Sequence, residues 1–152
     1  MSRISDLGDN FRNLDSVLSS YDKALDEADE ILSLKGKTLE QANKENPAWQ
    51  VYYDQKRVEL KTLVDYLELQ VQRVRSRLFK NLTQASQHDL SDRAKDKYID
   101  GEKTYLDAYE IYLEVKDMYD KYQAVVNGFT SRGYALNNIT KIRVAALEDV
   151  VL

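Results

Sequence analysis

The chain of 152 residues contains no cysteine, a single proline and few glycines. Without cysteine it can form neither a disulfide nor a thiolate zinc site, which is compatible with a reducing cytoplasm. With one proline and few glycines, the chain has few helix-breaking residues, while Leu, Ala, Glu, Lys, Asp and Gln are abundant. This composition is typical of a mostly helical protein, and a chain of this length fits a single domain with a moderate core.

Long apolar runs are also absent. No stretch approaches the roughly 20 apolar residues that a membrane-spanning helix needs, and no apolar signal-peptide core opens the chain. We therefore expect a cytoplasmic protein that has no membrane partner. Its net charge of −4 argues against a protein that coats duplex DNA by bulk charge, so any nucleic-acid site must be local.

Catalytic and metal-binding motifs are missing as well. The sequence has no P-loop, no HExxH, no nucleophile elbow and no dinucleotide-binding glycines. The only histidine, His88, lies in a polar turn, where a surface role is far more common than catalysis. The acidic residues at 26–30 lack the glycine-containing loop of a calcium site and are typical of a solvated helix face. We expect a protein that is not an enzyme and has no catalytic residue, metal or cofactor.

Acidic residues are absent from two windows, and this absence is the most informative one. Residues 69–88 and 121–147 each contain four Lys or Arg and no Asp or Glu. A surface selected only for solubility mixes its charges. Segregated charge favours a local anionic partner, of which nucleic acid is the first candidate and a membrane surface the second.

The first window has a regular pattern. Arg73, Arg77 and Lys80 follow helical spacing on one face, with Arg75 on an adjacent face and Phe79 beside them. One interpretation is an ordinary surface helix whose arginines pair with acids on neighbouring helices. The other is a phosphate-binding face, which we favour because like charges one turn apart repel and no acid lies within the same stretch.

Helix signals divide the chain into four predicted segments. Gly36 is placed to end the first helix, and a capping box at residues 38–41 predicts a short helical turn. Asn46 followed by Pro47 predicts the start of the second helix, and Gly133 predicts a break before the last. The expected helices span about 10–34, 46–85, 91–130 and 137–150, with an apolar seam in the first that begins at Phe11.

A seven-residue repeat of large side chains marks the third predicted helix. A repeat of this length predicts a partner helix and coiled-coil packing, with each tyrosine ring lying over small residues. We interpret these rings as packed side chains, not as exposed platforms for bases, because residues 89–120 are net acidic. The repeat consists of Tyr98, Tyr105, Tyr112, Tyr119 and Val126.

The last predicted helix has two apolar faces, which is more apolar surface than one short helix buries in a monomer. It therefore predicts a contact between subunits. The predicted fold is all-α, with long antiparallel helices in heptad packing and a C-terminal oligomerisation helix. Its expected parts are an N-terminal helical segment 1–45, a long hairpin 46–130 and the C-terminal helix 131–152. The expected oligomerisation residues are Leu136, Ile139, Ile142 and Leu147.

Two segments carry a resemblance to a known family. The stretch 131–136, Ser-Arg-Gly-Tyr-Ala-Leu, continues through Ile139, Ile142 and Arg143 and resembles the C-terminal signature of the UvsY family, recombination mediators of T-even-like bacteriophages. Upstream, residues 75–78, Arg-Ser-Arg-Leu, are similar to the family's basic Lys-x-Arg-Leu segment. The similar region covers roughly residues 49–145. Arg stands where the family has Lys, and the aromatic pair and glycine-rich turn that follow in the family are replaced.

The resemblance implies a helical ring, commonly a heptamer, that is assembled by its C-terminal helix. It also implies binding of single-stranded DNA, displacement of the single-strand-binding protein and loading of a RecA-like recombinase, in the host cytoplasm if the protein is phage-encoded. Repetition of weak cations around a ring turns modest affinity into avidity.

The leading hypothesis is thus a homo-oligomeric recombination mediator that binds single-stranded DNA. The alternative is a coiled-coil structural or assembly adaptor without nucleic-acid binding, and a membrane-surface protein is disfavoured because the basic helix lacks interfacial Trp. A second basic surface is predicted at Arg132, Lys141 and Arg143, which either bind phosphate or pair with acids such as Glu148 and Asp149 of another subunit. The expected DNA-binding residues are Arg73, Arg75, Arg77 and Lys80.

Overall fold

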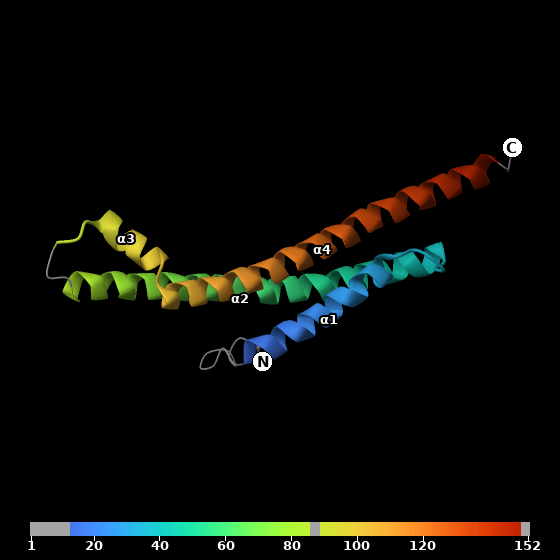
Figure 1. Ribbon diagram of the computed structural model, residues 1–152. Coiled ribbons are helices and arrows are strands. Elements are labelled where there is room, and N and C mark those ends of the chain that lie inside the picture. The colour runs from blue at the N-terminus through green and yellow to red at the C-terminus, as the bar shows by residue number, and fades with distance from the viewer. Residues whose placement is uncertain (1–12, 86–88, 150–152) are drawn as a thin grey trace. The chain divides into compact units, whose positions relative to one another are not determined.

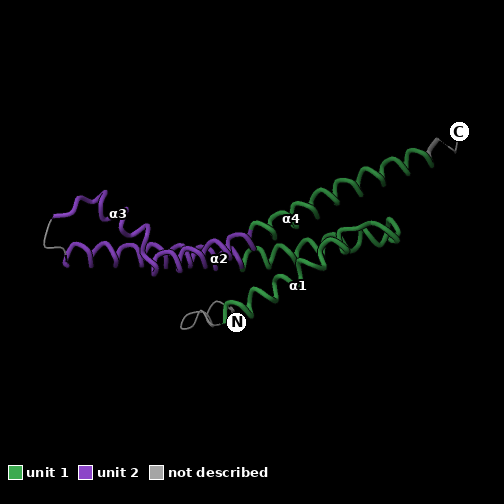
Figure 2. Tube along the Cα trace, in the orientation of Figure 1, with its two compact units in different colours: residues 1–59, 120–152 green, residues 60–119 purple. Residues whose placement is uncertain are grey.

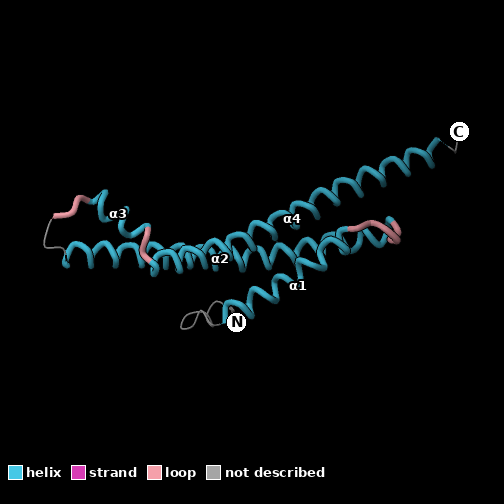
Figure 3. The backbone as a smooth tube through the Cα atoms, in the orientation of Figure 1, coloured by secondary structure: helices cyan, strands magenta, loops and turns pink. Residues whose placement is uncertain are grey.

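In the computed structural model, which describes residues 13–85 and 89–149, every regular element is an α-helix (Figures 1 and 3). The all-α class that the composition predicts is therefore confirmed for the described part of the chain. None of the helices described is long and apolar enough to span a membrane. The helices are α1 (Leu14–Leu32), α2 (Leu39–Ala85), α3 (Asp92–Asp100) and α4 (Lys103–Asp149).

Helix α1 is amphipathic and ends before Gly36, as the sequence predicts. Gly36 has a φ of +76° in the turn to α2, a left-handed conformation that glycine adopts without strain. The predicted start near residue 10 and the seam position Phe11 lie outside the described residues. The buried face of α1 consists of Leu14, Leu18, Tyr21, Ala24 and Ala28.

Helix α2 begins earlier than the sequence predicts. The capping box forms, since the Gln41 N–H donates to Thr38 Oγ1 at 3.2 Å and the Thr38 N–H donates to Gln41 Oε1 at 3.3 Å. The helix then continues through Pro47, so the predicted start at Asn46 was wrong. Asn46 is buried and its side-chain amide donates to the Phe129 carbonyl oxygen at 3.3 Å. Its amide thus contacts α4 instead of capping α2.

The predicted third and fourth helices are divided at a different point. Ser91 caps α3 by accepting from the Ala94 N–H at 3.3 Å, and α3 ends at Asp100 with Gly101 as its C-cap. Helix α4 then runs without a break through Gly133 to Asp149. The predicted break at Gly133 was wrong because this glycine serves a close approach: a Cβ there would lie 3.1 Å from the amide nitrogen of Asn46.

The chain forms two compact units (Figure 2). Unit 1 comprises Met1–Glu59 and Asp120–Leu152, and unit 2 comprises Leu60–Tyr119. The predicted boundaries after residues 45 and 130 both fall inside continuous helices. Helices α2 and α4 each contribute to both units, so the sequence signals for segment ends do not mark where packing changes.

Aromatic rings form the core of unit 1. The rings of Tyr53 and Phe129 stack at 5.4 Å, and Tyr21 meets Tyr122 edge-on at 5.6 Å. The Tyr53 hydroxyl donates to the Ala24 carbonyl oxygen and the Tyr122 hydroxyl to that of Tyr21, both at 2.8 Å. Each buried hydroxyl thus has an acceptor, and α1 is joined to both α2 and α4.

Unit 2 has a smaller core of aliphatic side chains. Among the described residues between 68 and 114, Ile99 alone is buried. The other described residues of this stretch are half-buried or exposed. The buried residues of unit 2 are Leu60, Leu63, Val64, Leu67, Ile99, Val115 and Met118.

Candidate nucleic-acid interface

Three of the four predicted DNA-binding residues form an exposed stripe on α2. Arg73, Arg77 and Lys80 are all exposed and follow the spacing of one helix face. Within residues 13–85 and 89–149, none of the three takes part in an ion pair. We call these residues the basic stripe. Their guanidinium and ammonium groups can bind phosphate without first leaving an internal partner.

Arg75 lies in a different environment. Its guanidinium donates to Asp100 at 2.9 Å and to Asp96 at 3.1 Å, and it lies 5.4 Å from the centre of the Tyr105 ring. The hydrogen bonds to Asp100 and then Asp96 raise the pKa of Arg75. The acids come from α3, which follows in sequence, so Arg75 pairs with acids on a neighbouring helix, as the first of the two interpretations expects. Its charge is already balanced inside unit 2.

Phe79 is half-buried, and the Lys95 ammonium group lies 5.1 Å from the centre of its ring. This is the geometry of a cation–π contact. One face of the ring is therefore already in contact with α3, and Phe79 contributes to the packing of α3 on α2.

Arg132, predicted in a second basic surface, is buried instead. Its side chain is 6% exposed, Nη1 donates to the Ile31 carbonyl oxygen at 2.7 Å, and the guanidinium lies 5.9 Å from the Phe129 ring centre. Desolvation by this burial lowers the pKa of Arg132. Neither Nε nor Nη2 has a hydrogen-bond acceptor among the described residues. Arg132 thus joins the end of α1 to α4, and the prediction that it is a surface cation was wrong.

Lys141 and Arg143 are exposed near the end of α4. They are therefore accessible to an anionic partner, as the second basic surface requires. The side chains of Glu148 and Asp149, the acids predicted to pair with such cations, lie outside the part of the chain whose side chains the structure describes, as do His88 and Val150.

The predicted oligomerisation residues divide into two groups. Leu136 is 2% exposed and belongs to the core of unit 1, so its assignment to a subunit contact was wrong. Ile139 is half-buried, whereas Ile142 and Leu147 are each 69% exposed. The apolar surface that remains open lies at the end of α4.

An aromatic groove in unit 2 was missed by the sequence analysis. The rings of Tyr105 and Tyr109 are nearly parallel at 5.9 Å, and Tyr109 and Tyr112 follow at 5.8 Å. They line an open groove of about 320 Å³ together with Glu68, Val71, Gln72 and Arg75. The heptad repeat favoured fully packed rings. The interleaved residues Val115, Tyr122 and Phe129 on α4 are fully buried instead.

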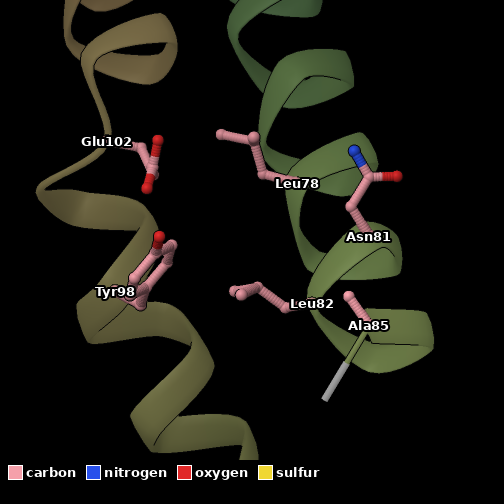
Figure 4. Close-up of a pocket in the computed structure, with 6 residues that line it drawn as sticks. All are labelled: Leu78, Asn81, Leu82, Ala85, Tyr98 and Glu102. Atoms are coloured by element: carbon pink, nitrogen blue, oxygen red, sulfur yellow. The ribbon is translucent and has the colours of Figure 1, made fainter.

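A second pocket of unit 2 lies between α2 and α3, with a volume of about 240 Å³. Figure 4 shows Leu78, Leu82 and Ala85 of α2 facing Tyr98 across this space. The pocket is mainly aliphatic, and its other lining residues are Asn81 and Glu102. Among the described residues no cluster of His, Cys, Asp or Glu is arranged to hold a metal ion.

Comparisons with protein-family models, curated proteins and solved structures found no match to this chain.

Proposed function

We propose that this protein is a recombination mediator that binds single-stranded DNA through the basic stripe. The observation that carries the proposal is the exposure of Arg73, Arg77 and Lys80 on one face of α2, without an ion pair in the part of the chain that the structure describes. Three cations spaced over two helical turns suit a flexible phosphate backbone, and no base-reading geometry accompanies them. Arg75 lies beside the stripe in sequence, and its ion pairs with Asp96 and Asp100 hold α3 against α2 within unit 2.

The remaining steps of the proposed function come from the resemblance to the UvsY family. In this proposal the protein helps displace the single-strand-binding protein and loads a RecA-like recombinase, without catalysing a reaction itself. Three phosphate contacts per chain bind weakly, so the proposal requires a homo-oligomer in which several stripes engage one strand. A ring, a heptamer by resemblance, meets that requirement.

Assembly is proposed to use the heptad pattern and the end of α4. Ile142 and Leu147, both exposed, are the members of the predicted set that a neighbouring subunit can bury. The half-buried Ile139 lies next to them in the same helix and completes the contact.

Titration of a labelled oligonucleotide against the protein tests the proposal. With three phosphates neutralised per engaged chain, the logarithm of the affinity should fall with the logarithm of salt at a slope of about −2. A variant that combines Arg73→Ala, Arg77→Ala and Lys80→Ala should lose about tenfold or more in affinity at low salt, with a flatter slope.

The matched control removes the same charge elsewhere. Lys23, Lys35 and Lys44 are exposed in unit 1, and their joint replacement by alanine should leave DNA affinity close to that of the parent. Equal losses in the two triple variants would mean that net charge, and not the stripe, determines binding. Circular dichroism of both variants checks that the helices remain.

One observation favours a second candidate, the assembly adaptor without nucleic-acid binding. Arg75 pairs with Asp96 and Asp100, which is how an adaptor uses basic residues. The adaptor becomes the better account if the parent shows no salt-dependent binding to single-stranded DNA.

A further inference from the structure

The end of α4 has an unpartnered apolar surface. All seven residues from 141 to 147 are exposed, and five of them are apolar: Ile142, Val144, Ala145, Ala146 and Leu147. Ile142 and Leu147 are 69% exposed and Val144 is 49% exposed. These side chains point in several directions around the helix. A helix segment that is apolar on most sides is normally buried against other protein. We call residues 141–147 the tail segment.

The tyrosine groove of unit 2 is a second apolar surface, on the same helix. Next to Tyr105, Tyr109 and Tyr112 on α4 lie Leu106 and Leu113, which are 47% and 44% exposed. With Tyr109 itself 38% exposed, the groove and these leucines form one continuous strip along successive turns. Stacked rings beside aliphatic side chains offer a firm apolar floor for a docking helix.

The two surfaces carry opposite charge. Lys141 and Arg143 are the charged residues of the tail segment, and both are exposed. Glu68 lines the groove, and Glu110, next to Tyr109 in the sequence, is exposed on α4. The one cation in the groove wall, Arg75, is balanced by its two aspartates. Charge therefore favours the tail segment as the occupant of the groove.

We propose that the tail segment of one copy of the chain docks into the tyrosine groove of a second copy. Both surfaces belong to α4, about 30 residues apart along the chain. The contact joins two different patches, and such heterologous contacts close into rings or extend into filaments. The inference rests on the homo-oligomer of the proposed function and identifies the surface that receives the C-terminal helix.

The arrangement leaves the DNA-binding residues open. Groove-lining Glu68, Gln72 and Arg75 occupy one face of α2, with steps of four and three residues. At about 100° per residue, Arg73 and Arg77 project nearly half a turn away from that face.

A mixing experiment tests the contact. The tail variant combines Ile142→Asp with Leu147→Asp, and the groove variant combines Tyr109→Asp with Leu113→Asp. Each variant retains one intact surface, so neither can form a chain of contacts with itself, and both should sediment as monomers. Mixed in equal amounts, they should form a one-to-one heterodimer, because one intact tail segment meets one intact groove.

Charge reversal provides a second pair of variants. The substituted positions are exposed, so these changes leave the apolar packing of each chain intact. Lys141→Glu with Arg143→Glu should weaken assembly, and Glu68→Lys with Glu110→Lys should weaken it too. A chain carrying both reversals should assemble again, since the charges are complementary once more. Circular dichroism checks the helices of every variant.

Several outcomes would overturn the inference: a groove variant that assembles like the parent, a mixture that stays monomeric, or a parent that is itself monomeric. A groove variant that loses DNA affinity while both it and the parent are monomers would reassign the tyrosines to base stacking. Heterodimer formation by a protein that binds no single-stranded DNA would leave the docking contact standing and remove the proposed function.

Discussion

At the scale of single residues, neighbouring arginines of the same sequence window have different roles. Arg77 is exposed, whereas Arg75 binds Asp96 and Asp100. We predict that Arg77→Ala weakens binding of single-stranded DNA with little change in stability. Arg75→Ala should instead lower the free energy of unfolding by about 1 kcal/mol, since partly exposed ion pairs contribute roughly 0.2–1 kcal/mol each.

Urea unfolding and oligonucleotide titration of the two single variants distinguish these roles. An Arg75→Ala protein with unchanged stability and a DNA affinity as low as that of Arg77→Ala would contradict the assignment. Because the two substitutions remove the same charge from positions two residues apart in α2, each serves as the control for the other.

Buried tyrosines make stability depend on alkaline pH. Burial raises the pKa of Tyr53 to about 12 and also raises that of Tyr122, whereas an unfolded tyrosine titrates near 10. The unfolded chain therefore loses these protons first. The stabilising contribution is complete below about pH 10 and is lost as the pH rises from about 10 to 12.

Urea midpoints at pH 8, 9, 10 and 11 measure this loss. Tyr53→Phe should cost about 1 kcal/mol at pH 8, because the hydrogen bond to the Ala24 carbonyl is removed, and should show a shallower decline above pH 10. Tyr134 is 69% exposed, so Tyr134→Phe is the matched control and should follow the parent. An identical alkaline decline in the Tyr53 variant and the parent would show that other groups cause it.

At the scale of helices, the close packing of α2 on α4 in unit 1 depends on a glycine. A methyl group at Gly133 would lie 3.1 Å from the Asn46 amide nitrogen, which itself donates to the Phe129 carbonyl oxygen. Alanine in a helix interior is favoured over glycine by about 1 kcal/mol. We predict that displacement of Asn46 offsets this gain, so that Gly133→Ala is neutral or destabilising.

A double-mutant cycle isolates the contact. In an Asn46→Ala background the obstructing amide is gone, and Gly133→Ala should then stabilise the protein by about 1 kcal/mol. Thermal unfolding of the four proteins gives the coupling energy. Equal effects of Gly133→Ala in both backgrounds would mean that the glycine is present for a reason other than this contact.

At the scale of the whole molecule, burial is unevenly distributed between the two units. Unit 1 buries several aromatic rings, whereas most of residues 68–114 in unit 2 is partly exposed. Amide hydrogen exchange should therefore be slow in α1 and in residues 120–136, and faster in residues 68–85 and 103–114.

Assembly should change this pattern at two places. In the proposed oligomer, residues 105–113 and the tail segment should gain protection relative to the tail variant Ile142→Asp, Leu147→Asp, because each proposed contact buries both surfaces. Mass-spectrometric exchange at matched concentration measures the difference. Protection that changes in the tail segment alone would place the receiving surface outside the tyrosine groove.

The sequence by itself determined the helical class, the α1 turn at Gly36, the capping box at residues 38–41 and the exposed basic stripe. These features depend on local chemistry: the backbone preference of each residue, hydrogen bonds between side chains one turn apart, and cations that have no acidic residue nearby in the sequence. A left-handed glycine, a capping pair and a helix face are encoded within a few residues, so a pattern is enough to find them.

The tertiary structure alone decided the features that depend on distant partners. Arg75 is balanced by acids of α3, and Arg132 is buried against the end of α1. Gly133 lies inside a helix because it faces Asn46 across the packing of α2 on α4. Glycine, arginine and asparagine each fit either a loop or a packed helix, and the choice depends on the residue on the facing helix. Sequence spacing along one helix does not specify that residue.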